Sequence, residues 1–241
     1  MTTVLLVRHG RTTANTSGVL AGWSPGVFLD ERGEEQAAAL AARIAEVPLA
    51  AVVTSPLERC RQTSEAILAA RVGTKHALDT GAQVEERVGE CRYGDWTGRG
   101  LHELAVEELW KSVQIHPSAV TFPGEGGEAL RTTQARAVDA VREWNDRIAA
   151  EHGPDAMYLV CSHGDVIKAL VADALGMHLD MFQRVQVDPC SLTVISYGSM
   201  RPTVGRLNDT GGSVAGLLPP AGGRRESASG DAVVGGGAGA P

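Results

Sequence analysis

Two short segments place a histidine directly after a run of apolar residues and directly before a glycine. Residues 4–10 read VLLVRHG and carry His9, and residues 158–164 read YLVCSHG and carry His163. Histidine is the side chain whose ordinary pKa lies nearest neutrality, so it serves as a nucleophile or as a proton carrier. A lone histidine in this setting is usually structural, but two in the same setting favour a shared chemical role.

A third segment, residues 54–59, follows another apolar run and reads TSPLER. Ser55 fits a helix N-cap, Pro56 the first helical position and Glu58 the third, which predicts a capping box. Arg59 then lies in the first turn, where free N–H groups and the helix dipole favour an anion. The dipole disfavours a cation there by roughly a few tenths of a kcal/mol. This arrangement favours an anion-binding arginine over an ordinary surface arginine.

The elements that must position these residues are buried strands. A short, continuous apolar run beside a turn signal indicates a strand buried on both faces, and we expect such strands over 4–7, 49–53 and 156–161. In a parallel arrangement their carboxyl ends share one edge of the sheet, where open α/β sheets bind ligands. The sequence therefore predicts that His9 and His163 meet at that edge.

Helical periodicity and turn signals fill in the rest of the chain. Three closely spaced runs near the end leave no room for intervening helices, so we expect antiparallel strands there. We expect one helix that begins at the N-cap Asp30, a second that ends near Ala70, a third over 101–110 and a fourth that ends near Gly153. We expect strands over 75–79, 182–187, 191–197 and 202–207.

Composition excludes several function classes. The chain of 241 residues has 22 basic and 29 acidic side chains and a net charge of −7, which argues against a nucleic-acid partner. No apolar run approaches the ~20 residues that span a bilayer, so we expect no membrane contact. No signal peptide is apparent.

Cysteine usage predicts a cytoplasmic protein. Cys60, Cys91, Cys161 and Cys190 are scattered and form no CxxC pair, which indicates reduced thiols rather than disulfides or a zinc site.

The composition changes near the C-terminus, and this predicts the domain organisation. Residues 211–241 hold ten of the 29 glycines and no aromatic residue. Such a segment buries too little apolar surface to offset the entropy of ordering. We expect one domain over 1–210 and a disordered Gly/Ala/Pro-rich tail over 211–241.

An acidic loop is a further candidate for acid–base chemistry. Residues 84–98 combine bounding glycines, an aromatic pair and mixed charge, which is typical of an ordered loop. The residues alone do not choose among Glu85, Glu86 and Glu90.

These motifs together resemble the histidine phosphatase superfamily, which has the phosphoglycerate-mutase-like fold. The resemblance rests on Arg8-His9-Gly10 with Thr12 and Asn15, on 55–63 (SPLERCRQT) and on Ser162-His163-Gly164. It covers roughly residues 3–210. It implies a three-layer α/β/α sandwich around a central, mostly parallel sheet with an antiparallel edge.

The resemblance also implies residue roles. The proton donor of the family lies four residues before the glycine of an aromatic-Gly-x-Trp segment, and residues 93–96 match that segment, which selects Glu90. His9 is then the nucleophile that becomes phosphorylated; Arg8, Arg59 and a protonated His163 surround the phosphoryl oxygens; Asn15 and Gly164 line the same phosphate pocket. Phosphoryl transfer depends on positioning and charge stabilisation, which these groups supply without a metal or other cofactor.

In the segments that face the substrate, the resemblance favours a phosphatase of the subgroup often labelled probable phosphomutase. Mutases of the family carry extra basic residues after the glutamate loop, whereas residues 101–122 hold only Lys111 as a firm cation. The loop before the long helix has Glu125 inserted and Ala129 in place of a serine. We therefore expect hydrolysis of a small phosphorylated metabolite by an acid-phosphatase mechanism.

Three alternatives are weighed against this interpretation. The first is a phosphomutase, and the second is a non-catalytic interaction protein that keeps the fold. The third, a serine hydrolase using Ser162, lacks the first glycine of a Gly-x-Ser-x-Gly elbow. The sequence leaves the individual substrate and the oligomeric state open, a homodimer being one alternative.

Overall fold

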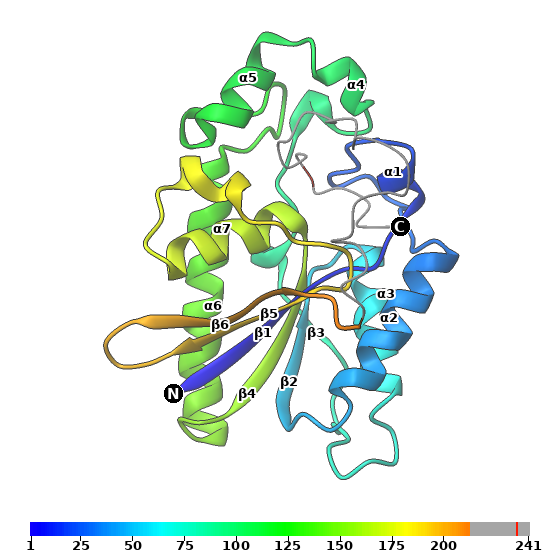
Figure 1. Cartoon of the computed structure of the whole chain (residues 1–241), viewed down its shortest axis with the longest axis vertical. Coiled ribbons are helices and arrows are strands. Elements are labelled where there is room, and N and C mark those ends of the chain that lie inside the picture. The colour runs from blue at the N-terminus through cyan, green and yellow to red at the C-terminus, as the bar shows by residue number, and fades with distance from the viewer. Residues whose placement is uncertain (213–234, 236–241) are drawn as a thin grey trace, which may run out of the picture.

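Six strands form one sheet in the order β3-β2-β4-β1-β5-β6 (Figure 1). The computed structural model describes residues 1–212 and Gly235. The first four strands along the chain are mutually parallel, β5 is antiparallel to β1, and β6 is antiparallel to β5. The strands are β1 (Thr2–Arg8), β2 (Leu49–Thr54), β3 (Gln83–Val84), β4 (Met157–Ser162), β5 (Leu192–Tyr197) and β6 (Pro202–Asp209).

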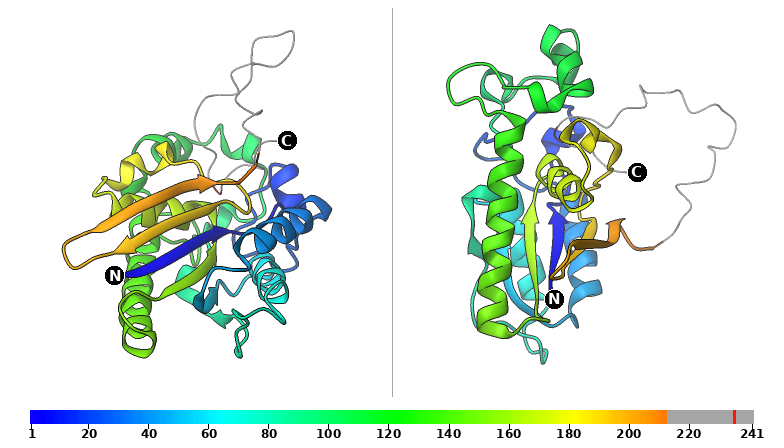
Figure 2. Two further views of the ribbon diagram at one scale, coloured as in Figure 1. Left: turned by 60° about the horizontal axis from the view of Figure 1, so that its bottom comes forward. Right: turned by 90° about the vertical axis from the view of Figure 1, so that its left-hand side faces the viewer.

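Helices cover both faces of the sheet. Their bounds are α1 (Thr13–Thr16), α2 (Glu31–Ile44), α3 (Glu58–Ala69), α4 (Leu101–Leu104), α5 (Glu108–Ile115), α6 (Leu130–His152) and α7 (Gly164–Ala174). Figure 2 shows α6 on one side of the sheet and α2 on the other. This is the predicted three-layer α/β/α sandwich with an antiparallel edge.

The burial of alternate residues along β1 explains the layers. Val4 and Leu6 pack in one cluster with side chains of α6 and α7, whereas Leu5 and Val7 pack in a second cluster with side chains of α2 and α3. Because successive strand residues point to opposite faces, a run of four apolar residues supplies both clusters. The continuous apolar run is therefore the sequence feature that places β1 in the middle of the sheet.

The register of the central strands places the two histidines at one level. β1 pairs with β4 in parallel, and Arg8 lies opposite Ser162. His9 and His163 each follow by one residue, at the carboxyl edge of the sheet, as predicted. Beyond this edge α4 and α5 form a cap (Figure 1), which shares a third apolar cluster with Tyr93 and Trp96.

The predicted helix ends are confirmed at two positions. Asp30 is the N-cap of α2 and accepts a hydrogen bond from the N–H of Gly33. Gly153 follows α6 with φ of 93°, a conformation that glycine adopts without strain. The closing strands β5 and β6 are antiparallel, also as predicted.

Three expected elements are wrong. Residues 75–79 form turns, and β3 at 83–84 pairs with β2 instead. Residues 179–184 form a 3₁₀-helix in place of a strand over 182–187, because Leu179 and Phe182 are buried at a spacing of three residues, which matches that helix. The single helix expected over 101–110 is two helices, with a break at 105–107.

The remaining expectations concern the ends and environment of the chain. Most of the predicted disordered tail, 213–234 and 236–241, lies outside the described residues, so the domain boundary at 210 stays a prediction. Within 1–212, no helix combines the length and the apolar character that crossing a bilayer requires. All four cysteines are free and buried. The cytoplasmic location stays a prediction.

Candidate active site

His9 lies at the end of β1 and is 3% exposed. Its Nδ1 lies 2.7 Å from the carbonyl oxygen of Gly10. Because a carbonyl oxygen only accepts hydrogen bonds, Nδ1 carries the proton of the neutral ring and Nε2 carries the lone pair. Burial, followed by the charges of Arg59 and Arg8, holds the pKa of His9 well below its usual value. His9 is therefore a neutral imidazole, the form that a nucleophile requires.

Arg59, in the first turn of α3, links the two histidines. Its Nε donates to Nε2 of His9, and its Nη2 contacts Nδ1 of His163, both at 3.3 Å. Nη2 also donates to the carbonyl of Gly22 at 2.9 Å. The remaining nitrogen, Nη1, is buried without a hydrogen-bond partner among the described residues. With the two imidazole rings 5.2 Å apart, this unused donor makes the cluster suited to an anion.

Ser55 orients His163. Its Oγ lies 2.7 Å from Nε2 of His163 and accepts a longer bond from the N–H of Leu57. Because Arg59 can only donate to Nδ1, the neutral ring of His163 carries its proton on Nε2 and donates it to Ser55. The N-cap of α3 is Leu57, with no side-chain cap. The predicted capping box is therefore wrong, because the hydroxyl of Ser55 is engaged by the histidine.

The protonation of His163 also differs from the expectation. The ring is fully buried, and burial, followed by the charge of Arg59, lowers its pKa well below the usual value. A protonated His163 was expected, but desolvation and a neighbouring guanidinium both oppose a further positive charge. His163 in this arrangement is neutral.

Glu90 is a buried carboxyl group beside His163. It is 3% exposed, its Oε1 accepts from the N–H of Cys91 at 3.0 Å, and its Oε2 lies 3.9 Å from Nδ1 of His163. Burial, followed by the negative charge of Asp165, raises the pKa of Glu90 to about 7, against the opposing charge of Arg59. A carboxyl group with this pKa holds a proton below neutrality and gives it up above, as a general acid–base requires.

The other two carboxyl groups of the loop face elsewhere. Glu85 accepts two hydrogen bonds from the guanidinium of Arg87, which lowers its pKa. Glu86 is exposed. Of the three candidates, only Glu90 reaches the histidine cluster.

The main chain at Glu90 is fixed by two side chains that the sequence did not single out. Its carbonyl accepts from Nε1 of Trp23 at 2.6 Å and from Nη2 of Arg136 at 3.0 Å. Arg136, on α6, also donates to the carbonyl of Gly89 and to the carboxylate of Glu128. Because every residue type has a backbone oxygen, contacts to these oxygens leave no pattern in the sequence. Trp23 and Arg136 were therefore not predicted.

Motif residues outside the cluster hold the His9 loop. Thr63 accepts from the N–H of Gly10 at 3.1 Å and donates to the carbonyl of Arg59 at 2.8 Å. A Cβ on Gly10 would lie 2.5 Å from the carbonyl oxygen of Gly33. Gly10 therefore allows the backbone of the His9 loop to lie close to α2.

The other predicted site residues take different places. Arg8 is fully buried, donates to the carbonyl of Val187 at 2.8 Å, and acts through its charge on His9 and Glu90. Asn15 uses its Oδ1 locally, as the acceptor of two bonds from Thr12 at the start of α1. Gly164 is the buried first residue of α7. The structure thus joins His9, Arg59, His163 and Glu90, with Arg8 acting on them; phosphate contacts of Asn15 and Gly164 stay predictions.

Comparison with known proteins places this geometry in a family. A sequence model of the histidine phosphatase superfamily (branch 1) matches residues 4–210. The chain belongs to this superfamily. Its α/β fold and the convergence of His9 with Arg59 and His163 agree with that membership.

Named relatives of this superfamily member are both phosphatases and mutases. The chain is 28% identical over 208 residues to the adenosylcobalamin/alpha-ribazole phosphatase of Escherichia coli K12, covering 84% of this chain and 94% of that protein. It is 27% identical over 190 residues to the 2,3-bisphosphoglycerate-dependent phosphoglycerate mutase 2 of Gloeobacter violaceus, covering 79% and 83%. The solved structure of Bacillus stearothermophilus YhfR matches with a TM-score of 0.73 and 28% identity, covering 87% and 98%. The chain is therefore an enzyme of the phosphatase/mutase type.

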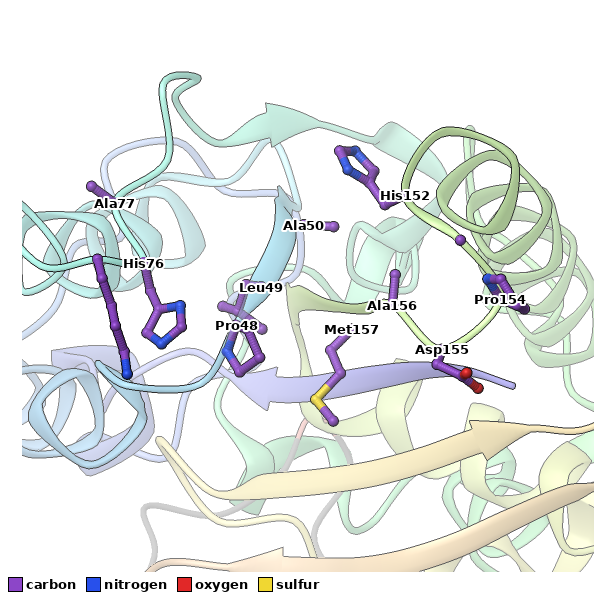
Figure 3. A pocket seen from close by; sticks show the side chains of 12 residues that line it. Pro48, Leu49, Ala50, His76, Ala77, His152, Pro154, Asp155, Ala156 and Met157 are labelled. Atoms are coloured by element: carbon purple, nitrogen blue, oxygen red, sulfur yellow. The ribbon is translucent and has the colours of Figure 1, made fainter.

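A separate cavity lies at the opposite edge of the sheet. It has a volume of about 580 Å³ and lies at the amino ends of β2 and β4, with Leu49 and Met157 in its lining. Figure 3 shows His76 and His152 on opposite sides of it. No residue of the His9 cluster lines this cavity.

Proposed function

We propose that this member of the superfamily hydrolyses a small phosphomonoester through a phosphohistidine on Nε2 of His9, with Glu90 as general acid and base. The observation that carries the proposal is the protonation pattern of the cluster. His9 is neutral with its lone pair on Nε2, and the pKa of Glu90 is raised to about 7. A free lone pair on Nε2 of the nucleophile and a proton on the acid are the state that begins the reaction.

The phosphoryl group would lie between the two histidines. Arg59 offers the unpaired Nη1 donor, and Arg8 adds a second buried positive charge. A phosphate dianion at this place would raise the pKa of His163, so that Nδ1 gains a proton and donates to a phosphoryl oxygen while Nε2 stays bonded to Ser55. The negative charge of the transferring group would then be matched by donors already in position.

The first step moves the phosphoryl group to the enzyme. Nε2 of His9 attacks phosphorus, the N–P bond forms, and the bond to the ester oxygen breaks. Glu90 gives its proton to that oxygen, which leaves as an alcohol. Glu90 ends the step as a carboxylate.

The second step returns the enzyme to its starting state. The carboxylate of Glu90 takes a proton from water while the water oxygen attacks phosphorus. The N–P bond breaks, inorganic phosphate leaves, and His9 regains its lone pair. The same pKa near 7 therefore serves both steps.

The experiment is hydrolysis of p-nitrophenyl phosphate by the purified chain with EDTA present. Because no step uses a metal, we expect turnover to be unaffected by the chelator. His9→Ala should lower kcat/KM at least about a thousandfold, some 4 kcal/mol. His76→Ala, which replaces a half-buried histidine lining the remote cavity, should retain it. Absence of turnover, or turnover that survives His9→Ala, would contradict the proposal.

A phosphomutase is the second candidate, and the similarity to the Gloeobacter mutase supports it. The first step would be the same, and a substrate hydroxyl would replace water in the second. Lys111, the one firm cation of the segment after the glutamate loop, is exposed on α5. We therefore favour hydrolysis. Phosphorus NMR separates the two, because a phosphatase accumulates inorganic phosphate and a mutase redistributes phosphate between ester positions.

A further inference from the structure

A second buried carboxylate, Asp165, lies beside the proposed acid and has no part in the steps above. It is the second residue of α7 and is 1% exposed. The hydroxyl of Tyr93 donates to its Oδ2 at 3.0 Å, and Nζ of Lys168 lies 3.4 Å from its Oδ1. Lys168 also donates to Oε1 of Gln183 at 2.9 Å. Buried charges are unfavourable unless they are paired, and this pair is held in a fixed orientation.

Asp165 lies on the leaving-group side of the site. It follows His163, which lies 3.9 Å from Glu90, by two residues, and its partner Tyr93 follows Glu90 by three. Burial, followed by the charge of Asp165, raises the pKa of Glu90, the proposed proton donor to the leaving oxygen. Tyr93 packs against Gly22, where an added Cβ would lie 3.0 Å from the ring. The carbonyl of Gly22 in turn holds Arg59. Groups next to Glu90 face the departing part of a substrate, because the phosphoryl oxygens face Arg59 and the histidines.

Oδ2 of Asp165 already accepts from a donor that lies outside the sandwich. The backbone N–H of Gly235 donates to it at 2.9 Å. A Cβ on Gly235 would lie 2.9 Å from Cδ1 of Leu20 and 3.8 Å from the hydroxyl oxygen of Tyr93. A donor from outside the cluster therefore reaches this oxygen beside Leu20 and Tyr93.

We propose that Asp165 determines specificity by accepting a hydrogen bond from a hydroxyl or ammonium group of the leaving group. The substrates would be phosphomonoesters of polyols or amino alcohols, rather than phosphorylated carboxylic acids. This inference rests on the proposed phosphatase function. A donor of the leaving group would take the place of the N–H of Gly235 at Oδ2, and a bond to a buried carboxylate is stronger than a bond between neutral groups. A carboxylate at the same place would instead meet the negative charge of Asp165.

The test compares pairs of substrates that differ only at the distal group. Glycerol 3-phosphate and 3-phosphoglycerate differ by a hydroxymethyl group in place of a carboxylate, and phosphoethanolamine and ethyl phosphate differ by an ammonium group. We expect kcat/KM for the donor member of each pair to be at least about tenfold higher, since losing a bond to a buried polar group is strongly discriminating. The measurements are made at pH 5.0. At this pH Glu90 is protonated in the unmodified chain and in any variant that keeps the pKa of Glu90 well above 5. Hydrolysis of p-nitrophenyl phosphate is recorded in parallel.

Asp165→Asn keeps the shape of the side chain and removes its charge. We expect it to lower the preference for glycerol 3-phosphate over 3-phosphoglycerate at least about tenfold, because the repulsion of the carboxylate disappears. Asp173→Asn is the matched control. It makes the same change on α7, at a side chain paired with Arg142 at the surface, and should leave the preference unchanged.

The outcomes separate this inference from the proposed function. If the unmodified chain treats both members of each pair alike, the inference is wrong, whether or not any variant folds. If Asp165→Asn lowers kcat/KM for both members equally, Asp165 acts only on the proton of Glu90, and the inference is again wrong. If the chain does not hydrolyse p-nitrophenyl phosphate, or if His9→Ala does, the proposed function fails and the inference fails with it.

Discussion

Replacing Glu90 by glutamine is expected to make the folded chain more resistant to unfolding at alkaline pH. The pKa of this buried carboxyl group is about 7 in the folded chain and 4.5 in its ordinary environment. The folded state therefore binds more protons than the unfolded state between these two values, so stability falls as pH rises through this window. The favourable contribution is present below pH 4.5 and is lost above pH 7.

The magnitude follows from the same two values. Their difference corresponds to about 3 kcal/mol, and most of it falls between pH 5 and pH 8. Glutamine keeps an oxygen that accepts from the N–H of Cys91 and carries no ionisable proton. The stability of Glu90→Gln relative to the unmodified chain should therefore rise by roughly 2 to 3 kcal/mol from pH 5 to pH 8.

Urea denaturation at the two pH values measures this difference. Glu128→Gln is the matched control, because the folded chain lowers the pKa of Glu128 instead of raising it. Burial raises the pKa of Glu128, but hydrogen bonds from Arg136 outweigh burial and the net change is a lowering. Its contribution to stability is present above the ordinary pKa of 4.5 and therefore at both pH values, so Glu128→Gln should change relative stability little between pH 5 and pH 8. A change below about 0.5 kcal/mol for Glu90→Gln would refute the assigned environment of this carboxyl group.

Three further predictions concern activity with p-nitrophenyl phosphate. Since Glu90 must be protonated to act as the acid, kcat/KM should fall about tenfold per pH unit above pH 7, and a flat profile from pH 5 to 9 would argue against this role. Arg59→Lys removes the planar fork that contacts both histidines, and kcat/KM should fall about a hundredfold; full activity would show that the guanidinium does not bind the phosphoryl group. Ser55→Ala frees Nε2 of His163, and kcat should fall about tenfold while the melting temperature changes little; an unchanged kcat would mean that His163 needs no orienting partner.

The part of the fold that the sequence predicts is the part whose pattern is local. The apolar run before His9 sufficed to place β1 between two helical layers, because a strand buried on both faces must be apolar at consecutive positions. The repeat of the pattern before His163 predicted that both strands end at one edge of the sheet, and the structure shows that β1 and β4 also pair. A glycine after each histidine marked the point where the strand ends.

What the sequence did not predict depends on partners that are distant in the chain. The pattern around Ser55 fits a helix cap. Only the structure shows that its hydroxyl is hydrogen-bonded to His163, 108 residues away. Gly22 contributes a carbonyl oxygen, which any residue type possesses. The choice of Glu90 among three acidic residues came from the resemblance, and its physical reason is burial, which a polar loop sequence does not indicate.

The strand expected at 182–187 failed for a different reason. Its apolar residues are few, and Phe182 pairs with Leu179, three residues earlier, at the spacing of a 3₁₀-helix. Packing against α7 decides between the two. Short apolar runs near the edges of the sheet are therefore the least predictable elements of this chain.

Detection of a phosphorylated histidine tests the central claim most directly. The purified chain is mixed with a phosphomonoester that it turns over, denatured in alkali to preserve the N–P bond, digested, and analysed by mass spectrometry. We predict phosphate on the peptide that contains His9, at the ring nitrogen Nε2, and none on that peptide in His9→Ala. Turnover without phosphate on His9, or phosphate on His163 instead, would contradict the account.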